Sequence, residues 1–207
     1  GKAVRENHCA VGFAVDPDAD RCALVDGNGE AIGEEYTLAI ATEAVLAKKK
    51  GDVCVNLSTS RMCADVAEKF GVGFSRAKVG EVNVSIQMMQ NNCVVGGEGN
   101  GGVIYPECHY GRDALVGIAL FLSHLAHLDM KVSELRRTLP DYCISKNRID
   151  LTPDTDVDAI LARVKELYKN ERVNDRDGVK IDFSDGWVHL RKSNTEPIIR
   201  VYSEAAT

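Results

Sequence analysis

The sequence predicts an α/β protein, with a mixed-sheet α/β domain followed by a smaller α+β domain whose sheet is largely antiparallel. Three observations lead to this prediction. Apolar runs of strand length alternate with helical runs between Glu34 and Leu139. After Pro140, short strand-like runs follow one another and are separated by turns. The length of 207 residues is enough for one large domain or two small ones.

The composition is that of an ordinary soluble protein, with 44% hydrophobic and 27% charged residues. The net charge of −6 predicts no general affinity for nucleic acid or for an anionic membrane. Seven cysteines include no Cys-x-x-Cys pair, which argues against a disulfide framework or a zinc site and favours a cytoplasmic location. The first thirty residues lack a signal-peptide pattern, and the longest apolar run is too short to span a bilayer.

Residues 1–32 look like the end of a domain. The stretch AVRENHC resembles the end of a helix, and the runs AVGFAV (10–15) and CALVD (22–26) resemble strands on either side of an acidic segment. Two strands and a helix end cannot bury a core of their own. We therefore expect the beginning of this domain to lie outside the sequence.

Residues 33–139 alternate between helix and strand and form the expected α/β domain. Gly71 lies where the second helix should end, and Ser60 is the expected N-cap of that helix. A glycine-rich loop covers residues 96–102. The expected elements are helices at 34–49, 60–70, 81–92, 110–129 and 133–139 and strands at 53–58 and 74–79.

Residues 140–207 form the expected α+β domain. The run YCISKNRID (142–150) reads as a strand, and DVDAILARVKELYKN (156–170) reads as an amphipathic helix. Strand-like runs follow at 178–183, 186–191 and 197–203. Short turns between these runs predict an antiparallel sheet.

The segment DPDADR (16–21) places Asp16, Asp18 and Asp20 at alternate positions, with Arg21 directly after them. Alternate residues of an extended chain face the same side, so the three carboxylates would converge and repel one another unless a cation lay between them. Oxygen ligands favour Mg²⁺ or Ca²⁺. An EF-hand is excluded, because its loop requires Gly at position six and Glu at position twelve. The alternative is a solvated acidic turn.

The segment RKSNTEPIIR (191–200) concentrates donors between two expected strands. It offers guanidinium, ammonium, hydroxyl and amide groups together with backbone N–H groups. This set suits a phosphate group. The alternative is a polar hairpin turn with exposed basic residues.

The segment GGEGNGG (96–102) places Glu98 and Asn100 among five glycines. Glycines let a backbone approach a ligand closely, and a carboxylate beside an amide suits a polyhydroxylated ligand such as a sugar. The pattern is not the Gly-x-Gly-x-x-Gly of dinucleotide-binding proteins. The alternative is a flexible turn.

Taken together and in this order, the three segments resemble the motifs of the α-D-phosphohexomutases, the family of phosphoglucomutase, phosphomannomutase and phosphoglucosamine mutase. The family's Asp-x-Asp-x-Asp-Arg metal loop appears as DPDADR, its Gly-Glu-x-Ser-Gly-His sugar loop as GEGNGG, and its phosphate loop as RKSNTEPIIR. The resemblance covers essentially the whole chain. It implies the end of the family's second domain at 1–32, the third at 33–139 and most of the fourth at 140–207.

The resemblance also implies roles for particular residues. Mg²⁺ would bind the three aspartates of DPDADR, with Arg21 beside the metal and the transferring phosphoryl group. Glu98 would bind sugar hydroxyls with support from Asn100, and two further residues, Arg61 and Lys78, fall in segments that line the family's cleft. The phosphate that is not being transferred would be held by Arg191, Ser193, Asn194, Thr195 and Arg200.

The sequence departs from the family's pattern in two respects. Asn100 and Gly102 replace the usual Ser and His of the sugar loop, which leaves the sugar open between hexose and hexosamine phosphate, with a lean toward glucosamine phosphate. The family's phosphoserine lies in a Ser-His-Asn loop, and the 207 residues contain none; Ser123-His124 lies within an apolar helical run. We therefore expect the missing amino-terminal domains to be the partner of this chain, which would be inactive alone.

Two other functions remain open at this point. The chain could be a non-catalytic module that binds sugar phosphates, because it carries no phosphoserine loop. A less favoured alternative is a phosphatase that uses an aspartate of the acidic segment as its nucleophile.

Overall fold

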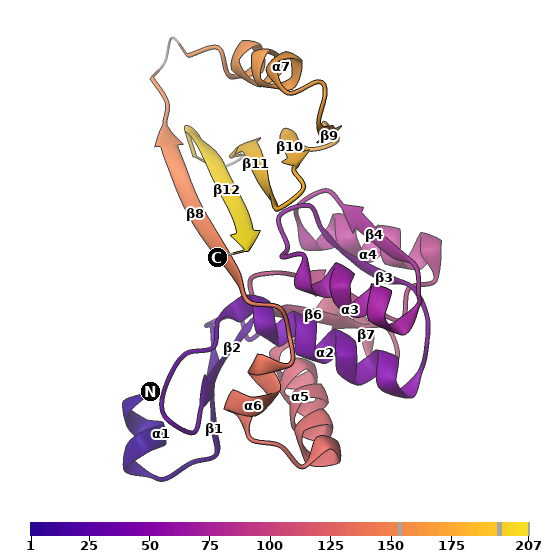
Figure 1. The fold of residues 1–207 in the computed structure, drawn as a ribbon, viewed down its shortest axis with the longest axis vertical. Helices are drawn as coiled ribbons and strands as arrows, with labels where there is room; N and C mark the ends of the chain where they lie inside the picture. The colour runs from indigo at the N-terminus through magenta and orange to yellow at the C-terminus, as the bar shows by residue number, and fades with distance from the viewer. Residues whose placement is uncertain (153–154, 194–195, 207) are drawn as a thin grey trace. The chain divides into compact units, whose positions relative to one another are not determined.

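The computed structural model describes residues 1–152, 155–193 and 196–206 (Figure 1). The chain forms two compact units, unit 1 at Gly1–Pro140 and unit 2 at Asp141–Thr207. Unit 1 contains a mixed sheet covered by helices, and unit 2 contains an antiparallel sheet with one helix. The predicted fold class is confirmed. No helix within the described ranges is long and apolar enough to cross a membrane.

A five-stranded sheet forms the centre of unit 1, in the order β4-β3-β5-β6-β7. β3 is parallel to β4 and β5, whereas β6 and β7 continue the sheet in antiparallel fashion. The central strands β3 and β5 are buried along their whole length, as expected where helices cover both faces. The strands are β3 (Val53–Asn56), β4 (Phe74–Ala77), β5 (Val95–Glu98), β6 (Gly102–Tyr105) and β7 (His109–Arg112).

Helices cover both faces of this sheet. The chain crosses from β3 to β4 in one direction along the sheet and from β4 to β5 in the other. Right-handed connections then place α3 and α4 on opposite faces. α2 packs against α3, α5, β5 and β6, so these helices share one face (Figure 1). The helices are α2 (Glu34–Lys48), α3 (Met62–Phe70), α4 (Glu81–Asn91), α5 (Ala114–Leu128) and α6 (Val132–Arg137).

The first 32 residues pack onto the same unit. After helix α1 (Lys2–Glu6), strands β1 (Val11–Val15) and β2 (Cys22–Asp26) form an antiparallel hairpin. Leu24 is fully buried, and the ring of Phe13 packs edge-on against Phe121 of α5, with ring centroids 5.8 Å apart. The hairpin is therefore held by α2 and α5, and its loop contains the acidic segment.

Three local predictions for unit 1 are wrong. The long helix does not begin at residue 110, because His109–Arg112 form β7 and Asp113 caps α5 by accepting hydrogen bonds from the backbone N–H groups of Leu115 and Val116. The glycine-rich segment is a β5–β6 hairpin rather than a loop. Arg61, not Ser60, is the N-cap of α3, and Ser60 Oγ accepts a hydrogen bond from Met62 N.

A buried carboxylate joins three helices of unit 1. Glu43 of α2 lies with its Oε1 atom 2.6 Å from Lys69 Nζ of α3 and its Oε2 atom 3.7 Å from His124 Nε2 of α5. Pairing with His124 and Lys69 holds the pKa of the Glu43 carboxyl below its usual value, although burial opposes this. A carboxylate with a lowered folded-state pKa stabilises the fold above its unfolded-state pKa and loses this effect as the pH falls.

We therefore expect Glu43→Gln to lower the free energy of unfolding by about 1 kcal/mol at pH 7, a modest value because Lys69 is largely exposed. The difference from the wild type should shrink toward zero as the pH falls below 4, where Glu43 becomes protonated. Urea unfolding from pH 7 to pH 3 measures it, with the exposed Glu30→Gln as the matched control. A difference in unfolding free energy that did not change with pH would show that the charge of Glu43 does not stabilise the fold.

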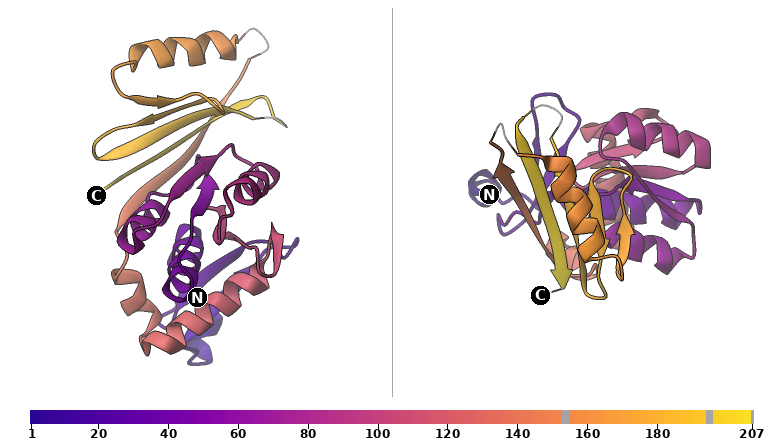
Figure 2. Two further views of the ribbon diagram at one scale, coloured as in Figure 1. Left: turned by 90° about the vertical axis from the view of Figure 1, so that its right-hand side faces the viewer. Right: turned by 90° about the horizontal axis from the view of Figure 1, so that it is seen from above.

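Unit 2 is a five-stranded antiparallel sheet in the order β8-β12-β11-β10-β9. Helix α7 (Val157–Leu167) packs against β10 (Figure 2). The ring of Tyr168 lies edge-on to the ring of Phe183, with centroids 5.8 Å apart. Phe183 lies on the same face as Val179 and Ile181, so α7 covers that face of the sheet. The strands are β8 (Tyr142–Asp150), β9 (Arg172–Asn174), β10 (Val179–Asp182), β11 (Gly186–Lys192) and β12 (Ile198–Ala206).

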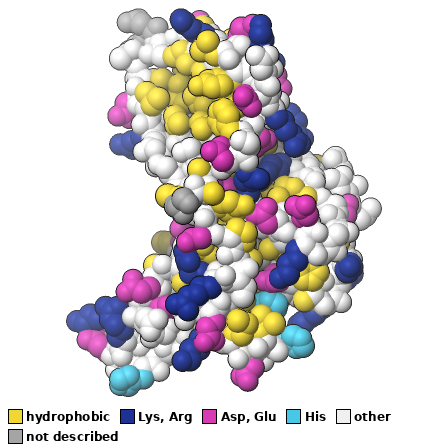
Figure 3. All heavy atoms as spheres, viewed as in Figure 1, with side chains coloured by type: hydrophobic (Ala, Val, Ile, Leu, Met, Phe, Trp, Pro, Cys, Tyr) yellow, Lys and Arg dark blue, Asp and Glu magenta, His cyan; other side chains and the backbone are white. Residues whose placement is uncertain are grey.

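The short edge strand β9 is not predicted from the sequence. Figure 3 shows hydrophobic side chains grouped on the surface of unit 2. The exposed large hydrophobic residues described in this unit are Ile149, Ile160, Leu167 and Tyr168.

Candidate functional site

The acidic loop between β1 and β2 is fixed by backbone hydrogen bonds. Ala19 N donates to Asp16 O at 3.0 Å, and Ala19 adopts a left-handed φ of 58°. Cys22 N donates to Gly101 O at 3.0 Å, and Ala114 N donates to Ala19 O at 3.2 Å. The loop is therefore attached to the glycine-rich hairpin and to the start of α5.

The three carboxylates of this loop converge as the alternation predicts. One oxygen from each of Asp16, Asp18 and Asp20 lies within 4.8 Å of the others. Among the described residues, Asp20 Oδ1 is buried and accepts no hydrogen bond. Burial raises the pKa of Asp20, which the ion pair with Arg112 opposes. Three hard oxygen ligands, one of them an unsatisfied buried atom, fit a divalent cation such as Mg²⁺.

Arg21 is bound to the loop that precedes it. Its Nε atom lies 2.7 Å from Asp16 Oδ2 and 3.6 Å from Asp20 Oδ1. Partial burial acts to raise the pKa of Asp16, but hydrogen bonds from Arg21 and Asp20 outweigh it and hold that pKa below the usual value. The Arg21 side chain remains 45% exposed, so it can reach a ligand beside the carboxylates.

Glu98 ends β5 and is nearly buried, at 4% exposure. Its Oε1 atom accepts hydrogen bonds from Asn56 Nδ2 at 2.7 Å and from Gly80 N at 2.9 Å. Its Oε2 atom accepts one from Arg112 Nη1 at 2.5 Å. Glu98 therefore links the last residue of β3 to the segment that follows β4.

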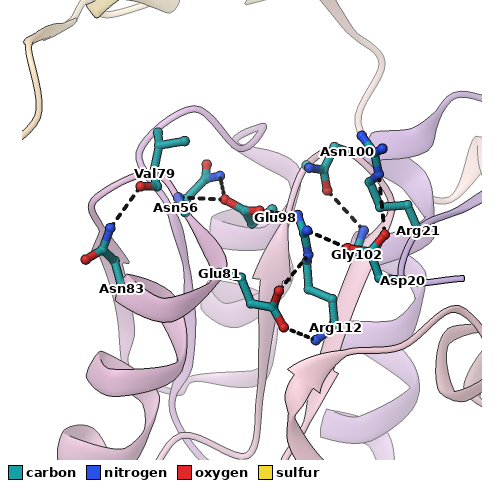
Figure 4. Close-up of polar contacts among 12 residues, drawn as sticks. Asp20, Arg21, Asn56, Val79, Glu81, Asn83, Glu98, Asn100, Gly102 and Arg112 are labelled. Atoms are coloured by element: carbon teal, nitrogen blue, oxygen red, sulfur yellow. Dashed lines mark hydrogen bonds and ion pairs between the residues drawn. The ribbon is translucent and has the colours of Figure 1, made fainter. Parts of the chain in front are cut away.

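Arg112, at the end of β7, is the residue that connects the acidic loop to the glycine-rich hairpin (Figure 4). Its guanidinium forms ion pairs with Asp20, with Glu98 and, at 3.5 Å through Nε, with Glu81. Its backbone N–H also donates to Glu81 Oε1 at 2.7 Å. A Cβ atom at Gly102 would collide with the Arg112 side chain, which explains a glycine at this position.

Arg112 and its partner Glu81 are not predicted as site residues from the sequence. Both lie in stretches whose pattern predicts helix, and no local motif contains them. An arginine at the end of a strand beside a glycine-rich hairpin becomes visible only once β7 is recognised.

Three other predicted residues, Asn100, Arg61 and Lys78, lie outside the network of ion pairs around Arg112. Asn100 Oδ1 accepts a hydrogen bond from Gly102 N at 3.2 Å, so its amide stabilises the turn that contains it. Arg61 and Lys78 follow the carboxyl ends of β3 and β4, and Lys78 is exposed. The crossovers reverse direction at β3, and ligands of open α/β sheets bind outside the carboxyl ends of the strands at such a point. The position of both residues is therefore suited to ligand binding.

The predicted phosphate loop joins β11 to β12 in unit 2. Asn194 and Thr195 lie outside the described residues. Ser193 is nearly buried, its N–H donates to Ile198 O at 3.0 Å, and its Oγ accepts a hydrogen bond from Glu196 N at 3.3 Å. Hydrogen bonding with Tyr202 raises the pKa of Arg200, with a further contribution from Glu196, whose Oε2 lies 2.8 Å from Arg200 Nη2.

Arg191 and Arg200 lie directly opposite each other on β11 and β12. Opposed side chains share one face of a sheet, with Cβ atoms about 4.5–5.5 Å apart, and like charges at such positions are destabilising. This pair lies on the face that α7 does not cover, because Arg191 alternates with Leu190, the partner of Val179. A bound anion would relieve the repulsion.

The chain is similar to several known proteins. A family model described as phosphoglucomutase/phosphomannomutase, alpha/beta/alpha domain III, matches residues 33–142, and a second, described as the phosphoglucomutase/phosphomannomutase C-terminal domain, matches residues 150–207. A phosphoglucomutase/phosphomannomutase of Thermococcus kodakarensis is 41% identical over 94% of this chain and 43% of its own length. A probable phosphoglucosamine mutase of Methanopyrus kandleri is 33% identical over 99% of the chain and 46% of its own length.

A solved structure of a phosphoglucomutase/phosphomannomutase family protein from Burkholderia thailandensis superimposes with a TM-score of 0.85 at 25% identity. It covers all of this chain, and the chain covers 44% of it. The chain thus spans less than half the length of these relatives.

Proposed function

Since this chain belongs to the phosphoglucomutase/phosphomannomutase family, we propose that it supplies the metal, sugar and phosphate sites of a phosphohexomutase that interconverts sugar 1-phosphates and 6-phosphates. In this proposal residues 1–32 end the family's second domain, 33–139 form the third and 140–207 form most of the fourth. The observation that carries the proposal is the attachment of the acidic loop to the glycine-rich hairpin through Arg112 and through the backbone hydrogen bond from Cys22 N to Gly101 O.

Asp16, Asp18 and Asp20 would hold Mg²⁺, whose positive charge would offset the charge that develops on a phosphoryl group during transfer. Arg21 would place its guanidinium beside that group. Its Nε atom is held by Asp16, while the side chain stays partly exposed and can reach a ligand. The hydrogen bonds within the loop fix these groups before substrate arrives, which limits the reorganisation needed during the reaction.

The sugar would lie against the β5–β6 hairpin. Glu98 would accept a hydrogen bond from a sugar hydroxyl at Oε2, where Arg112 occupies one of two acceptor positions, and Asn100 would support it through the turn. Arg61 and Lys78 would approach the sugar phosphate from the carboxyl ends of β3 and β4. The relatives are named for both hexose and hexosamine phosphates, and the preference for glucosamine phosphate stays a proposal.

The phosphate that is not transferred would be bound by the loop between β11 and β12, through Arg191, Ser193, Asn194, Thr195 and Arg200. The two opposed arginines support this role, because a phosphate dianion accepts paired hydrogen bonds from guanidinium groups. Holding this end of the sugar orients its other end for reaction.

The phosphoryl group would be carried by a phosphoserine of the amino-terminal domains and pass through a sugar bisphosphate. The 207 residues contain no Ser-His-Asn loop, and the Ser123-His124 pair lies in α5 with His124 buried. We therefore expect this chain alone to show no turnover in a coupled mutase assay with Mg²⁺, a hexose or hexosamine 1-phosphate and the matching 1,6-bisphosphate as primer.

The complete protein, with a Ser-His-Asn loop present, should be active in the same assay, and Arg200→Gln should reduce its kcat/KM. Turnover by the chain alone would show that another residue carries the phosphoryl group. A complete protein without such a loop that binds sugar phosphate but never turns over would favour the non-catalytic binding module.

A further inference from the structure

A third arginine continues the pair in the phosphate loop. Arg148 of β8 lies directly opposite Arg200 of β12, which itself lies opposite Arg191 of β11. The three guanidinium-bearing residues therefore form one row across three adjacent strands. Because opposed residues share a face, the row lies on the side of the sheet that α7 does not cover.

The acidic groups that the structure describes near this row do not neutralise it. Arg148 Nε lies 3.7 Å from Asp150 Oδ1, and the two side chains are 66% and 82% exposed. Arg200 pairs with Glu196, whose side chain is 46% exposed. Ion pairs at such exposed positions contribute little, so the repulsion along the row persists.

The centre of the row also contains an unsatisfied donor. Among the described residues, Nε of Arg200 is buried and has no hydrogen-bond partner. A buried donor without a partner is costly unless a ligand supplies an acceptor. The repulsion and this donor both favour binding of an anion with several acceptor oxygens.

We infer that Arg148 is a third guanidinium of the phosphate site, and that the site spans β11, β12 and β8 instead of the β11–β12 loop alone. The ligand is a phosphate monoester such as the non-transferring end of a sugar phosphate, because a tetrahedral dianion accepts hydrogen bonds from several forks at once. The inference rests on the proposed phosphate role of Arg191 and Arg200 and adds a residue to it from a strand about fifty positions away in sequence.

The neighbouring row on the same face differs in composition. There His189, Tyr202 and Lys146 lie opposite one another on the same three strands. Burial holds the pKa of His189 below its usual value, which favours its neutral form, so this row carries fewer positive charges. The three-arginine row is thus the part of this face best suited to a dianion.

Calorimetric titration of this chain with inorganic phosphate and with glucose 1-phosphate, at low ionic strength, tests the inference. We expect Arg148→Gln to weaken binding of both ligands by about 3- to 10-fold, the range for an exposed charge-assisted hydrogen bond. Arg148→Lys keeps the positive charge but lacks the forked guanidinium, so its affinity for both ligands should lie between those of Arg148→Gln and the wild type. Arg163→Gln on α7 removes the same charge from the opposite side of the sheet and should bind as the wild type.

Other outcomes distinguish an error about Arg148 from an error about the phosphate site as a whole. If Arg200→Gln loses phosphate binding while Arg148→Gln binds as the wild type, the loop is the site and the inference about Arg148 is wrong. If Arg200→Gln also binds as the wild type, or the wild type binds neither ligand, the proposed phosphate site itself is wrong. Thermal unfolding of each variant without phosphate checks the fold; relief of repulsion should leave Arg148→Gln at least as stable as the wild type.

Discussion

Replacing Arg112 with methionine is expected to lower the free energy of unfolding of this chain by about 3 kcal/mol. The substitution removes the guanidinium that pairs with Glu98, whose side chain is 5% exposed, and it leaves that carboxylate buried with only two neutral donors. Asp20 of the acidic loop loses its ion pair with Arg112 at the same time. Methionine keeps much of the volume, so the loss measures the charge and hydrogen bonds more than a cavity.

Urea unfolding measures this effect. The matched control is Arg137→Met on α6, an exposed arginine of the same unit, which should change stability by less than about 0.5 kcal/mol. Combining Arg112→Met with Glu98→Gln should cost less than the sum of the two single substitutions, because each removes the same interaction. A stability of Arg112→Met equal to that of the control would show that the network contributes nothing.

The second prediction concerns the acidic loop, where Asp18→Asn should weaken binding of Mn²⁺, used as a spectroscopic probe for the Mg²⁺ site, by about 100-fold or more. Loss of a residue that only supports a metal ligand already costs about 10- to 100-fold in affinity, so loss of a ligand should cost at least as much. Asp18 is the best position because, among the described residues, its exposed carboxylate makes no hydrogen bond or ion pair. Asp16 and Asp20 also bind Arg21 and Arg112, so their replacement would disturb the loop as well.

Electron paramagnetic resonance of Mn²⁺ at increasing chain concentration gives the affinity directly. Asp129→Asn is the matched control, because Asp129 is exposed, ends α5 with a left-handed φ of 51° that Asn adopts readily, and lies about 20 Å along the helix from the end that contacts the acidic loop. Wild-type affinity in Asp18→Asn would identify the segment as a solvated acidic turn.

The order of strands and helices followed from local pattern where the periodicity is strong. The helix predicted from Glu34 and the strand predicted at residues 142–150 occur in the structure with nearly the same limits. Prediction failed at residues 110–112 because the apolar run of α5 begins shortly after them. Asp113, the N-cap that precedes this run, was included in the predicted helix. The hairpin at residues 95–105 was missed because glycines carry no alternation of polar and apolar side chains.

The sequence by itself determined the three segments that carry the proposed chemistry, since alternating carboxylates, glycines beside a carboxylate and clustered phosphate donors are local features of DPDADR, GGEGNGG and RKSNTEPIIR. Only the tertiary structure decided what these segments touch. Arg112 reaches Asp20 and Glu98 because three segments distant in sequence meet beside one sheet, and Arg148 extends the arginine pair because β8 pairs with β12 in one register. Such neighbours arise from strand order and register, which depend on the packing of the whole chain and leave no mark at a single position of the sequence.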